Sequence, residues 1–269
     1  MVHRESGFLT IQGVQTYYEV AGDGEPILFI HGIDSDSRMW DKQVEVLSKS
    51  YKTIRFDLRG FGQTPMPLGE FHIQDDINHL MELLEIPSAH IIGYSFGGTV
   101  SLPFALKYPE RVKSIILAGA GMVGYDWSDE LSTYFREFQQ CWSNGNWDEM
   151  MRLLKWKSIY GPHRNEHGLV EICSLLDKMF LHAMKNVLRE GKPISPGDTR
   201  DRLHTVKVPT LILVGEMDFE DYHHIAEIYN QSLSNSIKKI VPDVGHFINL
   251  ENPSLFNEIT SNFIRNQNN

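Results

Sequence analysis

Hydrophobic and polar residues follow two rhythms along the chain, and each rhythm predicts one kind of element. Alternation with a period of two predicts paired strands over residues 8–12 and 14–20, near the start. Apolar runs predict buried strands at 26–30 and 89–94, and further strands are predicted at 53–56, 112–118, 210–214 and 237–241. Apolar positions three and four residues apart predict helices at 39–47, 73–84, 221–233 and 253–264. Such alternation indicates a mostly parallel eight-stranded sheet with helices on both faces.

The alternation of strands and helices stops in the middle of the chain. From about residue 121 to 204 no strand pattern occurs, and helical spacing is found near 131–142, 147–156 and 169–188. A chain of 269 residues is long enough for one large domain with an insertion. We therefore expect a core domain of residues 1–120 and 205–269 and a helical cap of residues 121–204.

The stretch Gly93-Tyr94-Ser95-Phe96-Gly97 lies between a predicted strand and a predicted helix. A serine on so sharp a turn has a strained backbone, and glycines two residues to either side remove side chains that would collide. The following helix points its amino end at the serine, so the amide of Phe96 can stabilise negative charge on a substrate oxygen. This context predicts a nucleophilic serine.

A serine hydroxyl needs a base to activate it and a group to orient that base. Two later strands end in suitable residues: 210–214 is followed by Glu216 and Asp218, and 237–241 is followed by His246. Asp221 and Asp126 are further candidates for the acid. The chain order of serine, acid and histidine fits an α/β-hydrolase and neither of the two other serine-enzyme orders.

With these motifs the chain resembles the α/β-hydrolase superfamily, in its capped branch of carboxylesterases and lactonases. The resemblance covers nearly the whole sequence. It rests on four separated motifs: His31-Gly32, the run from Asp57 to Gly62, the turn at Ser95, and Gly245-His246 followed by Glu251-Asn252-Pro253. The resemblance implies Ser95 as nucleophile, His246 as general base and Asp218 as orienting acid, with the backbone amides of Ile33 and Phe96 forming the oxyanion hole.

The substrate pocket is predicted less directly. His31 is expected to hold the turn that presents the Ile33 amide, and it is also a pocket candidate. The cap is rich in aromatic residues, most of which we expect to form its own core. The pocket candidates are His31, Met122, Tyr125, Trp127, Phe138 and Trp142.

Composition narrows the classes of partner. A formal net charge of −10 disfavours binding to nucleic acid or to an anionic membrane surface. We expect no metal, since the adjacent His223 and His224 have no third ligand in view, and no cofactor, since no phosphate-binding loop occurs. The amino terminus has no signal-peptide pattern and no segment is long enough to span a bilayer, so a cytoplasmic enzyme is expected.

These features together predict a serine hydrolase that cleaves small hydrophobic esters or lactones through an acyl-enzyme intermediate. Dehalogenases and epoxide hydrolases of the same fold use an aspartate nucleophile, which Ser95 argues against. Two alternatives keep the same three residues. One is a carbon–carbon bond hydrolase of aromatic ring cleavage, and the other is a small-molecule receptor with slow turnover.

Overall fold

The computed structural model describes residues 3–154, 169–186 and 191–267. Its main sheet has eight strands in the order β1-β2-β4-β3-β6-β7-β9-β10. The strands are β1 (Arg4–Ile11), β2 (Val14–Ala21), β3 (Pro26–Ile30), β4 (Lys52–Phe56), β6 (Ala89–Tyr94), β7 (Val112–Ala118), β9 (Thr210–Gly215) and β10 (Ser236–Val241). The predicted strands are all present, with ends shifted by a few residues.

Strand direction separates the two sides of the sheet. The pairs β1–β2 and β2–β4 are antiparallel, and the remaining pairs from β4 to β10 are parallel. The central strands β3 and β6 are buried almost throughout, as expected for strands covered on both faces. The predicted eight-stranded, mostly parallel sheet is therefore confirmed.

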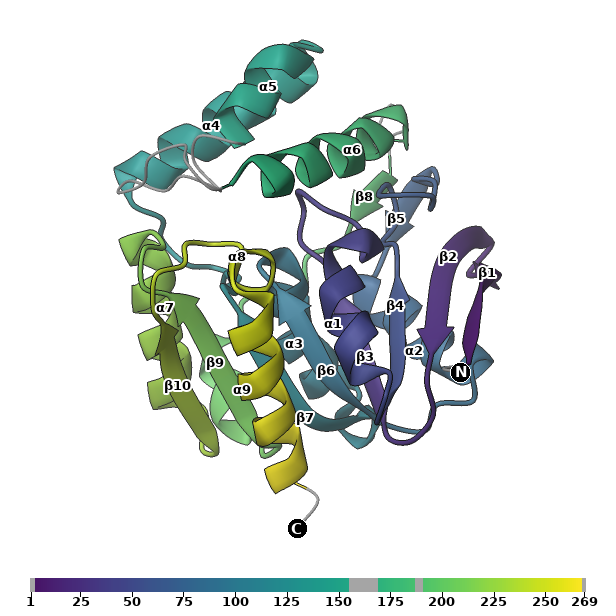
Figure 1. The fold of residues 1–269 in the computed structure, drawn as a ribbon. Coiled ribbons are helices and arrows are strands. Elements are labelled where there is room, and N and C mark those ends of the chain that lie inside the picture. Colours follow the sequence, from purple (N-terminus) through teal and green to yellow (C-terminus); the bar gives the residue numbers. More distant parts are fainter. Residues whose placement is uncertain (1–2, 155–168, 187–190, 268–269) are drawn as a thin grey trace.

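Helices cover both faces of this sheet (Figure 1). One hydrophobic core contains residues of α2 (Ile73–Leu83), α3 (Phe96–Lys107) and α7 (Glu220–Ser232). A second core, on the other face, contains residues of α1 (Asp41–Leu47) and α9 (Pro253–Asn266), with the short α8 (Ile248–Glu251) beside it. Alternate residues of each strand enter opposite cores, since successive side chains of a strand point to opposite faces.

Within the described residues, three α-helices lie between β7 and β9, where the sequence predicts a cap. They are α4 (Asp129–Ser143), α5 (Trp147–Leu154) and α6 (Val170–Asn186), and they lie above one end of the sheet (Figure 1). The predicted helices over 147–156 and 169–188 reach beyond the described residues. The division into a core and a cap at residues 121 and 204 stays a prediction.

The expectation that residues 121–204 contain no strand is wrong. The structure has a small second sheet in which β8 (Gly191–Pro193) pairs in parallel with β5 (Gly69–Phe71). Each strand is three residues long, too short to give a period-two pattern, and β8 contains both a glycine and a proline. This sheet ties the insertion to the core. Within the described residues, no helix is both long and apolar enough to cross a membrane.

Candidate functional site

Ser95 lies on a strained turn between β6 and α3. Its φ of 49° and ψ of −111° are in a region that side-chain-bearing residues seldom occupy. A Cβ atom on Gly97 would lie 2.1 Å from the carbonyl oxygen of Ile30, and one on Gly93 would lie 2.5 Å from the Gly97 carbonyl oxygen. Only glycine fits at these two positions, so the backbone of α3 packs directly on the end of β3.

Three side chains from three separate strand ends form one hydrogen-bonded row. The Ser95 hydroxyl is 3.1 Å from His246 Nε2, and His246 Nδ1 is 2.9 Å from Asp218 Oδ2. Because Asp218 accepts the Nδ1 proton, Nε2 is left as the acceptor for the serine proton. The Phe219 amide donates to Asp218 Oδ1 at 2.9 Å and holds the carboxylate in place.

The surroundings of His246 favour its protonated form. Burial acts to lower the pKa of the imidazole, but the charge of Asp218 and the hydrogen bond to it outweigh burial and raise the pKa above its ordinary value. The carboxylates of Asp34 and Glu251 act in the same direction. The ring can therefore hold a proton taken from Ser95 while remaining inside the protein.

Asp34 is a second buried carboxyl near the row. Its Oδ1 makes no hydrogen bond within the part of the chain that the structure describes, and the residue is 5% exposed. Burial raises the pKa of Asp34 to about 6, against the opposing charge of His246. Burying a carboxyl group without a full set of hydrogen-bond partners costs free energy, so packing alone does not explain Asp34 at this position.

The loop that carries His246 is fixed by backbone hydrogen bonds. Glu251 accepts the amide of Gly245 at 2.9 Å and the amide of Phe247 at 3.1 Å, on either side of the histidine. Gly119, at the end of β7, leaves room for the imidazole, since a Cβ there would lie 3.1 Å from Nδ1. The ring is thus held from both sides of its own loop and from the neighbouring strand.

His31 fixes the loop that precedes Ile33. Its Nδ1 donates to the Gly32 carbonyl oxygen at 2.7 Å, and its Nε2 accepts the Leu58 amide at 2.9 Å. Both bonds require a neutral ring, in agreement with burial, which lowers the pKa of His31. Asp57 supports the same region by accepting the amides of Ser37 and Gln63.

The amides of Ile33 and Phe96 come from elements that touch. Phe96 is the first residue of α3, where helix geometry leaves the N–H without an acceptor in the preceding turn. Ile33 follows the His31 clamp, and its side chain is 53% exposed. Both residues line the same cavity next to Ser95.

The rival acids lie elsewhere. Glu216 is exposed and accepts the Asp243 amide at 3.1 Å. Asp221 is buried but accepts the amide and hydroxyl of Ser128, at 2.8 and 2.7 Å. Asp126 is exposed. Of the four candidate acids, Asp218 is the one that contacts His246.

An apolar cavity of about 600 Å³ is lined by Ile33 and by Phe96, the residue that follows Ser95. Its wall is mainly aromatic and aliphatic, with Phe61, Met66, Phe71, Phe96, Phe135 and Phe138 among its residues. Its basic residue is Arg59, whose guanidinium pairs with Asp76 at 2.6 and 2.5 Å and lies 4.7 Å from the centre of the Phe71 ring. The arginine charge is therefore already neutralised.

The predicted pocket residues mostly lie outside this cavity. Phe138 lines it. His31 is completely buried in its loop, and Met122 is buried in the core of the sheet. Tyr125 and Trp127 pack against that same core because aromatic residues after β7 are close enough to reach it. The side chain of Trp142 lies outside the described residues.

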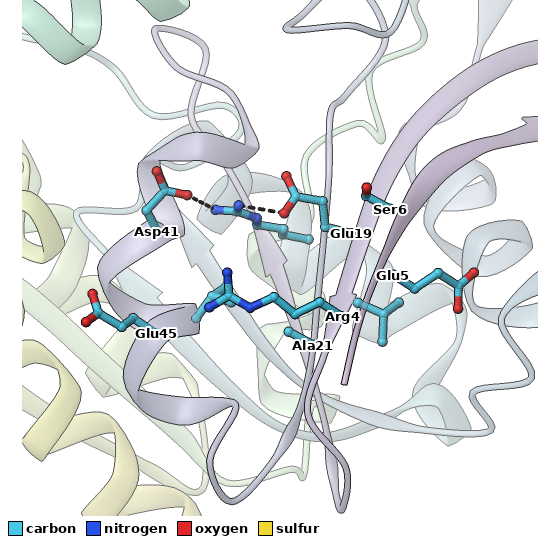
Figure 2. A pocket seen from close by; sticks show the side chains of 10 residues that line it. Arg4, Glu5, Ser6, Glu19, Ala21, Asp41 and Glu45 are labelled. Atoms are coloured by element: carbon cyan, nitrogen blue, oxygen red, sulfur yellow. Dashed lines mark hydrogen bonds and ion pairs between the residues drawn. The ribbon is translucent and has the colours of Figure 1, made fainter. Parts of the chain in front are cut away.

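A second cavity, of about 560 Å³, lies between the first two strands and α1. Charged side chains line it, including Arg4, Glu5, Glu19 and Asp41 (Figure 2). Arg55 crosses it and donates to Asp41 Oδ1 at 2.5 Å and to Glu19 Oε2 at 2.7 Å. The charged groups at the centre of this cavity, those of Arg55, Asp41 and Glu19, are therefore paired with one another.

Three residues near the row were not found from the sequence. In the sequence, Glu251 belongs to a motif that indicates no role for its side chain, Asp34 has no distinguishing pattern, and Tyr222 is predicted only to lie in a helix. Tyr222 packs its ring on His246 with centroids 4.3 Å apart. Its place one turn after Asp218, on the first turn of α7, was the available signal. Among the described residues, no group of histidine, cysteine and carboxylate side chains could hold a metal ion.

Comparison with known proteins agrees with this architecture. The family model for the alpha/beta hydrolase fold matches residues 25–155. A thermophilic esterase from Thermogutta terrifontis has a similar structure, with a TM-score of 0.80 and 24% identity over 98% of this chain and 99% of that one. The chain therefore has the fold of the α/β hydrolases.

Sequence relatives span several reactions. A 3-oxoadipate enol-lactonase of Acinetobacter baylyi is 24% identical over 89% of this chain and 88% of its own length. A 2-hydroxy-6-oxo-6-(2'-aminophenyl)hexa-2,4-dienoic acid hydrolase of Metapseudomonas resinovorans is 24% identical over 96% and 90%. An uncharacterised protein of Mycobacterium tuberculosis is 34% identical over 122 residues, and the match spans only 36% of that protein's length.

Proposed function

We propose that this protein is a serine hydrolase that cleaves neutral hydrophobic carboxylic esters or lactones through an acyl-enzyme intermediate. The observation that carries the proposal is the row Ser95–His246–Asp218, with Ser95 held at positive φ on the turn into α3. A serine, a base within hydrogen-bond reach and a carboxylate that orients the base are the parts that nucleophilic acyl transfer requires.

In the proposed reaction, Ser95 attacks the ester carbonyl carbon while its proton passes to His246 Nε2. The tetrahedral intermediate then collapses: the carbon–oxygen bond to the alcohol breaks, and the alcohol oxygen takes the proton from Nε2. Water next attacks the acyl-enzyme, gives a proton to Nε2, and releases the acid as Ser95 regains its proton. Asp218 keeps its charge throughout and stabilises the imidazolium.

The negative oxygen of each tetrahedral intermediate is assigned to the amides of Ile33 and Phe96. The Phe96 amide is at the amino end of α3, where the helix dipole favours negative charge. The Ile33 amide is held by the loop that His31 clamps on two sides. Two donors fixed by backbone contacts need little reorganisation during the reaction.

The cavity favours an uncharged, apolar acyl or alcohol group. A wall of phenylalanine and methionine side chains stabilises apolar groups by removing them from water. Arg59 would be the natural partner for a substrate carboxylate, but both of its bonds go to Asp76. This pairing argues against an anionic substrate, such as the dienoic acid in the name of the Metapseudomonas relative. A carbon–carbon bond hydrolase is therefore the second candidate function.

The experiment is steady-state hydrolysis of p-nitrophenyl esters from acetate to decanoate, together with Ser95→Ala. We expect multiple turnovers with the original chain and none above background with the variant, whose far-UV and thermal-melt profiles should stay unchanged. Turnover retained by Ser95→Ala would refute the assignment.

A serine-directed phosphonate probe, read by mass spectrometry, separates two kinds of failure. Labelling of Ser95 without turnover of any ester would mean a reactive nucleophile with a different substrate, and would favour the carbon–carbon hydrolase or receptor readings. Absence of both labelling and turnover would reject the serine hydrolase altogether.

A further inference from the structure

A tyrosine outside the proposed row lies against its histidine. Tyr222 is 8% exposed, its ring lies 4.3 Å from the His246 ring centroid to centroid, and Ser95 is among the polar groups near its phenol. The edge of Trp127 packs against the same ring, with centroids 5.7 Å apart and planes at 62°. Tyr222 is therefore held in place by aromatic contacts on more than one side.

The protonation state of the phenol defines what it can do. Burial and the nearby charge of Asp218 keep the pKa of Tyr222 well above its ordinary value. The phenol is therefore a neutral hydroxyl near neutral pH. It can donate a hydrogen bond but cannot act as a base.

The Ser95 hydroxyl already has a partner before the reaction. Its proton points to His246 Nε2, because Nδ1 donates to Asp218, and its oxygen keeps lone pairs that a nearby donor can use. As Ser95 attacks, its oxygen becomes an ester oxygen and a poorer acceptor. A donor that stayed on this oxygen would stabilise the starting state more than the transition state and would slow the reaction.

The phenol has a better acceptor as the intermediate collapses. The leaving oxygen must approach His246 Nε2 to take its proton. Because Tyr222 packs on the imidazole that delivers this proton, the leaving oxygen also comes within reach of the phenol. We infer that Tyr222 is a further catalytic residue, which donates a hydrogen bond to the leaving-group oxygen as its bond to carbon breaks.

The proton balance is simple in this step. The carbon–oxygen bond breaks, the electron pair stays on the leaving oxygen, and the proton that neutralises it comes from His246. Tyr222 keeps its own proton and only stabilises the charge. The inference rests on the proposed ester hydrolysis.

The test compares leaving groups in Tyr222→Phe, which keeps the ring and removes only the hydroxyl. We would measure kcat/KM, which reports the acylation step, for p-nitrophenyl butyrate and ethyl butyrate. For ethyl butyrate we expect a loss of about 10- to 100-fold, the size of a hydrogen bond to a charged oxygen. Nitrophenolate is a good leaving group that needs little stabilisation. The variant's kcat/KM for p-nitrophenyl butyrate should therefore fall by about threefold or less.

Tyr229→Phe is the matched control. Tyr229 lies on the same helix, is buried, and donates its hydroxyl to the Gly121 carbonyl oxygen at 2.7 Å. Removing this hydroxyl should lower the melting temperature. The ratio of kcat/KM for ethyl butyrate to kcat/KM for p-nitrophenyl butyrate should stay unchanged. A structural effect of removing a buried hydroxyl is thus separated from an effect on the leaving group.

Each outcome is decisive. A loss confined to the poor leaving group supports the inference. Equal losses of kcat/KM for both esters would mean that Tyr222 only orients Ser95 or His246. No loss for either ester would mean that its hydroxyl is not used. Either result overturns the inference and leaves the proposed function standing. Failure of the original chain to hydrolyse either ester would overturn both.

Discussion

The two cavities of this protein have similar volumes and opposite linings. The cavity beside Ser95 measures about 600 Å³ and is mainly aromatic, whereas the one between β1, β2 and α1 measures about 560 Å³ and is lined by charges. In the charged cavity Arg55 is bonded to Glu19 and Asp41 (Figure 2). In the apolar cavity Arg59 is paired with Asp76, and most of the remaining wall is aromatic or aliphatic.

The difference shows why volume alone does not identify a site. A cavity whose charges already pair gains little from a ligand, because binding must first replace those hydrogen bonds. An apolar wall gains by losing contact with water, and here it adjoins a strained serine with a base in reach. The next experiments test this contrast.

The largest effect is expected from Asp218→Asn, on the apolar side of the comparison. An amide would leave His246 in the wrong tautomer to accept the serine proton, so kcat should fall by about 10⁴-fold. The variant should keep its fold, since the side chains are nearly the same shape. Ester hydrolysis under saturating substrate measures the effect.

Glu216→Gln is the control for that prediction. It removes an exposed carboxylate two residues away, whose hydrogen bond goes to the Asp243 amide. Its kcat should match that of the original chain. Comparable losses in the two variants would point to a general effect of charge near this loop and would remove Asp218 from the row.

A smaller effect is expected from Phe138→Ala, which shortens the wall of the apolar cavity. Removing the ring should lower kcat/KM for p-nitrophenyl octanoate by about tenfold, the scale of one lost apolar contact. The acetate ester, too short to need this part of the wall, should be affected little. The ratio of the two esters is the measured quantity.

Arg4→Ala makes the same kind of change in the charged cavity. Its ester selectivity should equal that of the original chain. A selectivity change in Arg4→Ala, or none in Phe138→Ala, would break the functional distinction between the two cavities.

The smallest effect concerns pH. His246 accepts a proton only when neutral, so kcat/KM should rise with pH, and the midpoint should lie above the ordinary histidine value because the pKa is raised. The charge of Asp34 contributes to that rise. Asp34→Asn should therefore move the midpoint to lower pH, which a pH–rate profile would detect.

The exposed Asp126 offers the comparison variant here. Asp126→Asn removes a carboxylate that solvent screens, and its pH midpoint should stay where it was. An unmoved midpoint in Asp34→Asn would show that the buried charge does not act on the base.

The fold was largely predictable because its signals are local. The buried strand 26–30 is an uninterrupted apolar run, and the covering helix 73–83 has a three-and-four spacing. The pairing of β5 with β8 was not predictable, since two three-residue strands more than a hundred residues apart carry no periodicity. Their pairing depends on where the insertion meets the core.

The residues of the candidate site also fall into two groups, those that the sequence predicts and those that it does not. Ser95 and His246 follow strands directly, so the sheet itself brings them together. Tyr222 and Asp34 were missed because their importance depends on side-chain direction, which the position in sequence does not define. Side-chain direction also decides which residues line the cavity: Phe135 and Phe138 do, whereas Tyr125 and Trp127 pack against the core.

The close packing of Gly97 on β3 also bears on how such a protein changes over evolutionary time. A Cβ at Gly97 would lie 2.1 Å from the Ile30 carbonyl oxygen, so backbone atoms alone set the spacing between the Ser95 turn and the segment that leads to Ile33. Side chains of the cavity wall take no part in that spacing. Lineages can therefore exchange the wall, and with it the molecules they accept, while inheriting one unchanged reaction geometry.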